Sequence, residues 1–212
     1  KTTLANLIAR FFDPQRGAVY VGGIDVKNVA KEEMMNTVSF VFQNSRLIKA
    51  SILENVRMGR PDATREEVLK ALENAQCMDI IEKMPQGADT VIGANGVYLS
   101  GGEQQRIAIA RVMLKNTPIV ILDEASAFAD PDNEYRVQQA FSRLAQGKTV
   151  IMIAHRLSTV VNADCIYVLK DGEIAESGTS RALIDRGGIF SEMWADYQTS
   201  VQWKIEKEAC VQ

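Results

Sequence analysis

The chain has 212 residues and a formal net charge of −3 at pH 7, with 46% hydrophobic and 24% charged residues. This composition is that of a globular protein and excludes disordered, collagen-like and coiled-coil chains. The mildly acidic charge argues against nucleic acid as a partner, and no apolar run approaches the ~20 residues of a membrane-spanning helix.

The first predicted element is an amphipathic helix that begins at Lys1 and Thr2. Apolar side chains recur along it at helical spacing and share one face: Leu4, Leu7, Ile8 and Phe11. We therefore expect this face to pack against the rest of the protein.

Three short apolar runs predict strands, at residues 37–42, 119–122 and 149–154. Continuous apolar runs are typical of strands that are buried on both faces of a parallel sheet. Helical stretches lie between the runs, and right-handed crossovers through them make the strands parallel. The predicted fold class is therefore α/β with a mostly parallel sheet.

Helices and one hairpin complete the predicted fold. Residues 51–95 are interpreted as a helical insert beside the sheet, in which residues 65–75 have a clear helical period. The turn Lys170-Asp171-Gly172 between two short strands is typical of a β-hairpin, and a helix through residues 190–194 follows it. The last ten residues are predicted to fray.

Three cysteines are widely spaced in the chain: Cys77, Cys165 and Cys210. Their odd number and spacing favour free thiols in a reducing compartment over a disulfide framework or a zinc site. The apolar neighbours of Cys77 and Cys165 predict that both side chains are buried.

Polar residues follow each of the three predicted strands: Gln43, the pair Asp123-Glu124, and His155. The carboxyl ends of parallel strands lie at one edge of the sheet, where open α/β sheets bind ligands. One carboxylate of the pair is suited to hold Mg²⁺ through water, and the other to activate an attacking water. His155, the only histidine, is suited to bind a terminal phosphate, and Gln43 to bind the metal shell and the water. A carboxylate pair that enters a turn and an ordinary histidine are the alternatives.

Lys1-Thr2 matches the last two positions of the phosphate-binding pattern G-x-x-x-x-G-K-[ST]. In that pattern the lysine neutralises the β- and γ-phosphates, and the threonine hydroxyl binds Mg²⁺. The six earlier positions do not occur in this sequence, so an exposed helix start with a solvated lysine is the alternative interpretation.

The block from Leu99 to Gln104 is the most specific pattern in the chain. Within it, Ser100 and Glu103 form a capping box that opens a helix. A capping box needs no glycine in the first turn, where each glycine costs helix stability. Gly101 and Gly102 therefore indicate that another backbone or a phosphate approaches closely at a helix N-terminus, which favours anions.

These motifs occur in one order, and in that order the sequence resembles the ATP-binding domain of an ABC transporter from Lys1 to about Trp194. Residues 51–56 and 90–93 resemble the exporter-type branch. The resemblance implies a P-loop NTPase-like sheet core with a helical signature subdomain, without its N-terminal strands and phosphate-loop glycines. It also implies ATP and Mg²⁺ as cofactors.

The resemblance implies a role for each motif residue. The implied catalytic residues are Glu124, His155 and Gln43. The implied nucleotide-binding residues are Lys1, Thr2, Thr3, Ser100, Gly101, Gly102, Gln104 and Asp130. The implied Mg²⁺ ligands are Thr2, Gln43 and Asp123.

The resemblance also implies two partners. ABC ATPase domains work as head-to-tail pairs, so a second ATPase domain, on an identical or a different chain, would offer its nucleotide to the signature residues of this one. A transmembrane domain would contact the loop around Gln43 and the insert up to Gly96. The implied location is the cytoplasmic face of the cell membrane.

The domain prediction places the ATPase core in residues 1–50 and 116–200, the helical signature subdomain in 51–115 and a tail in 201–212. Because the sequence begins inside the phosphate-binding motif, we expect a fragment that binds ATP poorly by itself. The predicted function is the motor domain of an exporter-type ABC transporter. The alternatives are a soluble ABC ATPase without a transport role and an inactive remnant.

Overall fold

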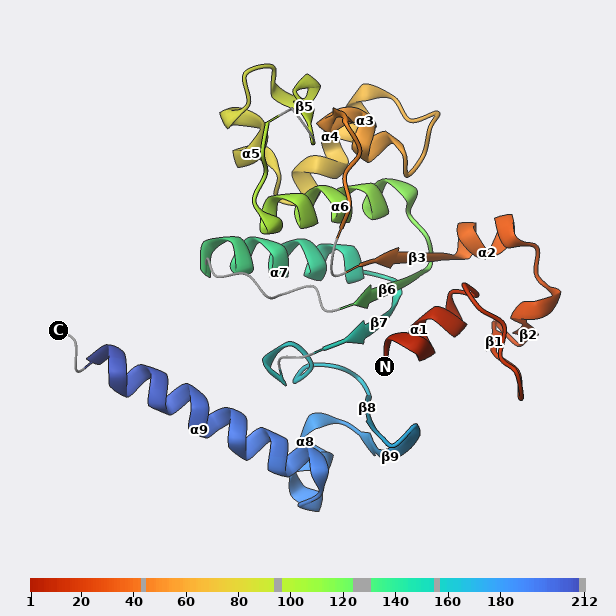
Figure 1. The fold of residues 1–212 in the computed structure, drawn as a ribbon, viewed down its shortest axis with the longest axis vertical. Helices are drawn as coiled ribbons and strands as arrows, with labels where there is room; N and C mark the ends of the chain where they lie inside the picture. The colour runs from red at the N-terminus through yellow and green to blue at the C-terminus, as the bar shows by residue number, and fades with distance from the viewer. Residues whose placement is uncertain (43–44, 94–96, 124–130, 155–156, 210–212) are drawn as a thin grey trace. The chain divides into compact units, whose positions relative to one another are not determined.

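The computed structural model describes residues 1–42, 45–93, 97–123, 131–154 and 157–209 (Figure 1). The backbone packs into two compact units, residues 1–153 and 154–212. Each unit is built around its own buried apolar residues.

The first unit contains a three-stranded parallel sheet in the order β3-β6-β7. Its strands are β3 (Val38–Val41), β6 (Ile119–Asp123) and β7 (Thr149–Ile153). The register aligns Val41 with Leu122 and Leu122 with Met152. The predicted parallel pairing of these three runs is confirmed.

Helices cover both faces of this sheet. Val120 and Leu122 pack in one apolar cluster with residues of α6 (Gly101–Lys115) and α7 (Pro131–Ala145). Ile121 points to the other face, where it packs in a second cluster with residues of α1 (Thr2–Ile8) and α2 (Lys31–Thr37). The alternation along β6 therefore separates α6 and α7 from α1 and α2 by the sheet.

The predicted helical insert is present and packs on α6. It consists of α3 (Ile52–Arg57), α4 (Arg65–Asn74) and α5 (Met78–Lys83), with a short antiparallel pair of β4 (Ala50–Ser51) and β5 (Val91–Ile92). A capping box between Thr64 and Glu67 starts α4, in agreement with the predicted helix over 65–75. Gly59 lets α3 approach α6, because a Cβ there would lie 2.3 Å from the carbonyl oxygen of Arg111.

The helix α1 is shorter than the apolar pattern predicts. It ends at Ile8, and Arg10 adopts a positive φ of 55°. The Arg10 guanidinium donates to the carbonyl oxygens of Lys27, at 3.0 Å, and Val29. This contact turns the chain, so Phe11 lies beyond the helix and is 50% exposed.

The turn that follows α1 leads into short elements. These are β1 (Tyr20–Val21), paired antiparallel with β2 (Ile24–Asp25), and the 3₁₀ segment η1 (Val26–Asn28). Two other 3₁₀ segments are η2 (Gly87–Asp89) and η3 (Leu157–Thr159).

The second unit contains the predicted hairpin and two helices. β8 (Ile166–Lys170) pairs antiparallel with β9 (Glu173–Gly178), and Asp171 and Gly172 form the turn with φ of 50° and 86°. Two positive φ values in a two-residue turn match the twist of the strands. The helices are α8 (Ser180–Arg186) and α9 (Ile189–Ala209). Within the described ranges, no helix is both long and apolar enough to cross a membrane.

The two described cysteines differ in exposure. Cys77 is buried, as predicted. The prediction for Cys165 is wrong, because this residue precedes β8 and is exposed.

Candidate functional site

The central strand ends in a half-buried carboxylate. β6 ends at Asp123, which is paired with Ile153 of β7 in the parallel ladder. Asp123 follows Ile121 by two residues, so both side chains leave the same face of the sheet. Because Ile121 packs in one cluster with Ala5 of α1, Asp123 lies on the face that α1 covers.

Lys1, Thr2 and Thr3 are exposed at the start of α1. Ala5 is 2% exposed and holds this helix against the sheet. Thr2 precedes Ala5 by three residues, which is less than one helical turn of about 5.4 Å. The packing of α1 therefore places a lysine ammonium and two hydroxyls on the same face of the sheet as Asp123.

The predicted capping box at the start of α6 is confirmed. The amide of Glu103 donates to Ser100 Oγ at 3.3 Å, and the amide of Ser100 donates to Glu103 Oε2 at 2.8 Å. Gln104 Nε2 donates to the carbonyl oxygen of Leu99 at 2.8 Å, which fixes the residue before the cap. Ser100 Oγ accepts in this arrangement, and a hydroxyl that accepts can also donate one hydrogen bond.

The two glycines of this turn have different surroundings. Gly101 is exposed, whereas Gly102 is buried. A Cβ at Gly102 would lie 3.0 Å from the Cβ of Asn133 in α7. The close approach predicted at Gly102 is therefore made by a side chain of the same chain.

The two groups of candidate residues lie on opposite faces of the sheet. Lys1, Thr2 and Asp123 are on the α1 face, and Ser100 begins a helix that packs on the other. A single chain thus does not bring Ser100 together with Lys1 and Thr2.

Four of the predicted residues lie outside the described part of the chain: Gln43, Glu124, Asp130 and His155. In sequence, Gln43 and His155 come two residues after the ends of β3 and β7, and Glu124 comes directly after β6. Their roles remain predictions.

A family model described as ABC transporter matches residues 1–127. This chain belongs to the ABC transporter family. A solved structure titled as a bacterial Atm1-family ABC exporter with ATP bound has a TM-score of 0.86 at 41% identity, over 92% of this chain and 34% of that one. The α/β fold of an exporter's ATP-binding domain, predicted above, is confirmed.

Curated relatives of this ABC chain are much longer than it is. The mycobactin import ATP-binding/permease protein IrtA of Mycobacterium tuberculosis is 48% identical over 94% of this chain, which spans 23% of that protein. The ATP-dependent lipid A-core flippase of Chromobacterium violaceum is 42% identical over 91% of this chain, which spans 33% of it.

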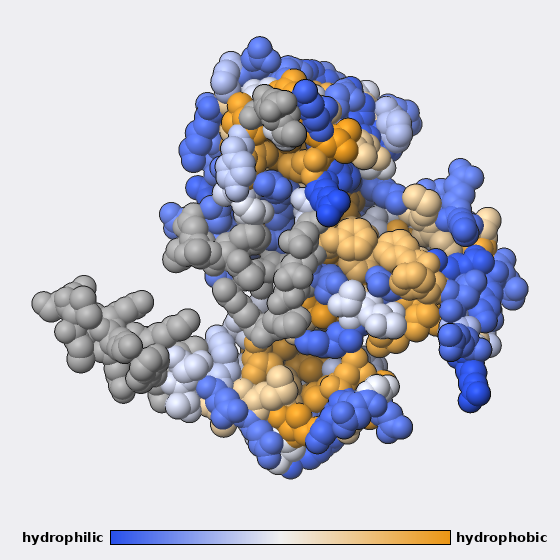
Figure 2. All heavy atoms as spheres, viewed as in Figure 1, coloured by the Kyte–Doolittle hydropathy of each residue, from blue (hydrophilic) through white to orange (hydrophobic). Residues whose placement is uncertain are grey.

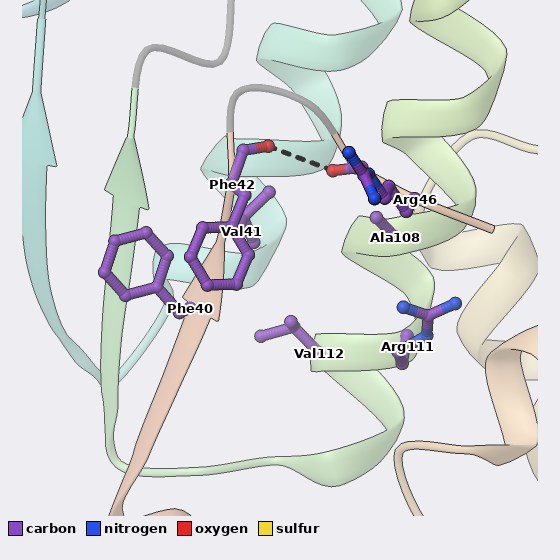
Figure 3. Close-up of a pocket in the computed structure, with 8 residues that line it drawn as sticks. Phe40, Val41, Phe42, Arg46, Ala108, Arg111 and Val112 are labelled. Carbon is purple, nitrogen blue, oxygen red and sulfur yellow. Dashed lines mark hydrogen bonds between the residues drawn. The ribbon is translucent and has the colours of Figure 1, made fainter. Parts of the chain in front are cut away.

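The ABC chain also has a hollow between the end of β3 and α6, with a volume of about 420 Å³. Figure 3 shows it as a groove between the two elements. We call it the β3–α6 groove. Its lining residues are Phe40, Val41, Phe42, Ser45, Arg46, Ala108, Arg111 and Val112. Sequence reasoning did not find it, because it is formed by segments far apart in the chain.

Exposed aromatic rings extend from this groove. Phe40 and Phe42 stack with ring centroids 4.3 Å apart, and Phe11 stacks on Phe42 at 6.0 Å. Phe42 is 46% exposed. Figure 2 shows apolar side chains gathered on the surface over β3. These rings form an exposed apolar patch beside the groove.

Sequence reasoning also missed Arg106, which is 1% exposed within α6. Its position was a usable signal. Arg106 lies three residues before Ile109 and four before Ala110, on a side of the helix that these apolar residues bury. A cation at such a position needs a specific partner.

Proposed function

We propose that this chain is the ATP-hydrolysing motor domain of an exporter-type ABC transporter. The observation that carries the proposal is the placement of two sets of phosphate-binding residues on opposite faces of one sheet. One nucleotide cannot contact both sets of the same chain, but a nucleotide between two such domains contacts one set from each.

The α1 face has groups that suit ATP and Mg²⁺. Lys1 supplies positive charge for the phosphates, and Thr2 and Asp123 supply a hydroxyl and a carboxylate on the same side of the sheet. Mg²⁺ is commonly bound by one or two carboxylates together with phosphate oxygens and water. When bound, the ion neutralises charge on the transferred phosphoryl group.

Three residues after the strand ends would carry out hydrolysis. Glu124 would accept a proton from the attacking water, and Gln43 would orient that water and complete the Mg²⁺ shell. His155 would donate a hydrogen bond to the γ-phosphate. The positions of all three in sequence, next to the ends of parallel strands, support these roles.

A second ABC ATPase domain would complete the site. Ser100, Gly101, Gly102 and Gln104 would serve the nucleotide of that domain, and Asp130 would lie near the pair's interface. The donor capacity of the Ser100 hydroxyl and the exposed Gly101 at the start of α6 support this role.

A transmembrane domain would contact this chain at the β3–α6 groove, and the chain would lie at the cytoplasmic face of the membrane. The relatives support this proposal, because IrtA is named an ATP-binding/permease protein. The exposed Phe42 and the two arginines that line the groove offer apolar and cationic contacts to a partner segment.

We also propose the domain division stated above: a core of residues 1–50 and 116–200, a helical signature subdomain of 51–115 and a tail of 201–212. The packing of α3, α4 and α5 against α6 in one cluster supports a helical subdomain.

The test is Glu124→Gln in the longest native polypeptide that carries this chain. ATP binding should persist while turnover falls by about 10²- to 10⁴-fold, the usual contribution of a general base. Glu82→Gln, at an exposed residue of α5, is the matched control and should keep full turnover. Undiminished hydrolysis in the Glu124 variant would remove Glu124 from the mechanism.

The same assay separates the alternatives. Turnover in a native polypeptide that has no membrane domain would indicate a soluble ABC ATPase. Absence of both ATP binding and turnover in the unaltered polypeptide would indicate an inactive remnant.

A further inference from the structure

A buried guanidinium joins three parts of the helical layer. Arg106 Nη1 and Nη2 donate to the two carboxylate oxygens of Asp79 at 2.7 and 3.2 Å. Nη1 also donates to the carbonyl oxygen of Gln76, and Nη2 donates to Oδ1 of Asn133 at 3.1 Å. A buried charge is costly unless it is paired in this way. Arg106 therefore ties α6 to the start of α5 and to α7.

A second contact lies beside the first. Gly102 precedes Arg106 by four residues, so both lie on one face of α6. A Cβ at Gly102 would come within 3.0 Å of Asn133 Cβ and 3.2 Å of its Cγ. Asn133 is thus held on one side by Arg106 and packed on the other against the glycine backbone.

These contacts join the first two turns of α6 to the first turn of α7. Figure 1 shows the two helices side by side with their N-terminal ends on the same side. If α7 moves relative to α6 here, the bond from Arg106 breaks or Asn133 presses on Gly102. Proteins pack too densely for such a shift to be absorbed without cost.

The two first turns follow the two functional segments of the chain. α6 begins directly after Ser100, and α7 begins at Pro131, directly after the segment that contains Glu124 and Asp130. In the proposed function, Glu124 acts on the chain's own nucleotide and Ser100 on the partner's. A fixed link between α6 and α7 therefore links two different nucleotides.

We propose that Arg106 and Asn133 are positioning residues that couple the two ATP sites of the ABC dimer by holding the N-terminal ends of α6 and α7 together. This inference rests on the proposed function. Neither residue needs to contact nucleotide. Asp79 belongs to α5, where it neutralises the buried cation. Its ion pair with Arg136 of α7 is long, at 3.7 Å, and partly exposed, so it contributes little to the link between α6 and α7.

The test compares Asn133→Ala with Asp79→Asn in the full native polypeptide. Asn133 is half-buried, so its truncation should leave the fold and the Arg106–Asp79 pair intact. We expect Asn133→Ala to lower the Hill coefficient for ATP toward 1 and to raise the half-saturating ATP concentration by about 2- to 30-fold, the usual range for a coupling residue. Asp79→Asn should lower the melting temperature and leave the Hill coefficient unchanged.

Arg106→Lys provides a second, independent arm. A lysine keeps the charge but cannot bind Asp79 and Asn133 simultaneously with a planar fork. Its effect on the Hill coefficient should match that of Asn133→Ala. The Hill coefficient of the double variant should be no lower than that of the more affected single variant, because both substitutions remove the same contact between Arg106 and Asn133. Arg65→Lys, at an exposed arginine paired with Asp89, is the control and should behave as the unaltered protein.

The outcomes separate the two proposals. Suppose that the unaltered polypeptide hydrolyses ATP, and that Asn133→Ala has the same Hill coefficient and half-saturating ATP concentration as the unaltered polypeptide. This result would overturn the coupling role alone. Equal losses of stability in the Asn133 and Asp79 variants, with no change in cooperativity, would show a purely structural contact. Absence of turnover in the unaltered polypeptide would overturn the proposed function and the coupling role together.

Discussion

Replacing Asn55 with alanine tests whether one buried amide holds the segment that leads from β3 into α3. Asn55 is fully buried. Its Nδ2 donates to the carbonyl oxygens of Ile48 and Ser51, both at 3.0 Å. Its Oδ1 accepts from the amide of Ile48 at 2.9 Å. The side chain thus forms hydrogen bonds with both the backbone N–H and the carbonyl oxygen of Ile48, as the backbone of a neighbouring strand would.

The size of the effect follows from these three bonds. A hydrogen bond of this kind contributes about 1 kcal/mol net, so the free energy of local opening should fall by about 3 kcal/mol. Since about 1.4 kcal/mol is a factor of ten in an equilibrium constant, the amide of Ile48 should exchange its hydrogen roughly 100-fold faster. The nearby Arg111 Nε, which donates to the carbonyl oxygen of Asn55 at 2.8 Å, should keep α3 on α6.

The assay is hydrogen–deuterium exchange with mass spectrometry on peptides that span residues 45–58 of the full native polypeptide. Asn28→Ala is the control, because Asn28 is an exposed asparagine in η1 and its loss should not change these peptides. Equal exchange in the Asn55 variant and the unaltered protein would show that the Asn55 side chain does not hold this segment. The pairing of β4 with β5 would then be what keeps it ordered.

Three further predictions concern stability and reactivity. Leu72→Ala empties a fully buried site in α4 and should reduce the free energy of unfolding by about 2–5 kcal/mol; an unchanged midpoint in urea would contradict this. Burial raises the pKa of Asp79, but the hydrogen bonds and charge of Arg106 outweigh it and leave that pKa below its usual value. The pair therefore stabilises the fold above about pH 3.9, the unfolded pKa, and this stabilisation is lost as the pH falls toward the lower folded pKa. In acid unfolding followed by fluorescence, stability should therefore depend less steeply on pH in Asp79→Asn than in the unaltered protein. Burial also raises the pKa of the Cys77 thiol to about 12, so iodoacetamide at pH 8 should label the exposed Cys165 and not Cys77 in the native protein, as mass spectrometry of the peptides will show.

The elements that local chemistry determines were predictable from the sequence. The continuous apolar run before Asp123 predicted a strand buried on both faces, and β6 is the central strand. The spacing of Ser100 and Glu103 predicted a capping box that the structure contains. Asp171 and Gly172 predicted a turn because both tolerate positive φ. In each of these cases the deciding residues are close together in sequence.

Two features that depend on contacts between distant segments were not predictable. α1 ends at Ile8 without a glycine or proline, because Arg10 is drawn to backbone carbonyls of Lys27 and Val29. The packing of Asn133 against Gly102 depends on α7, a helix that begins 29 residues later in the chain. A single sequence contains no local pattern for either contact.

The position of β3 has a consequence for biosynthesis. Its neighbour in the sheet, β6, follows only after the helices α3 to α6 have been made. This interval is on the order of 80 residues, which a ribosome needs about 4–15 s to add. Among the strands that the structure describes, β6 is the one that pairs with β3, so this pairing cannot form during that time, and the apolar Val38 and Val41 can associate with other nascent chains. Codons that slow translation through α6 lengthen this interval and should lower the yield of the protein.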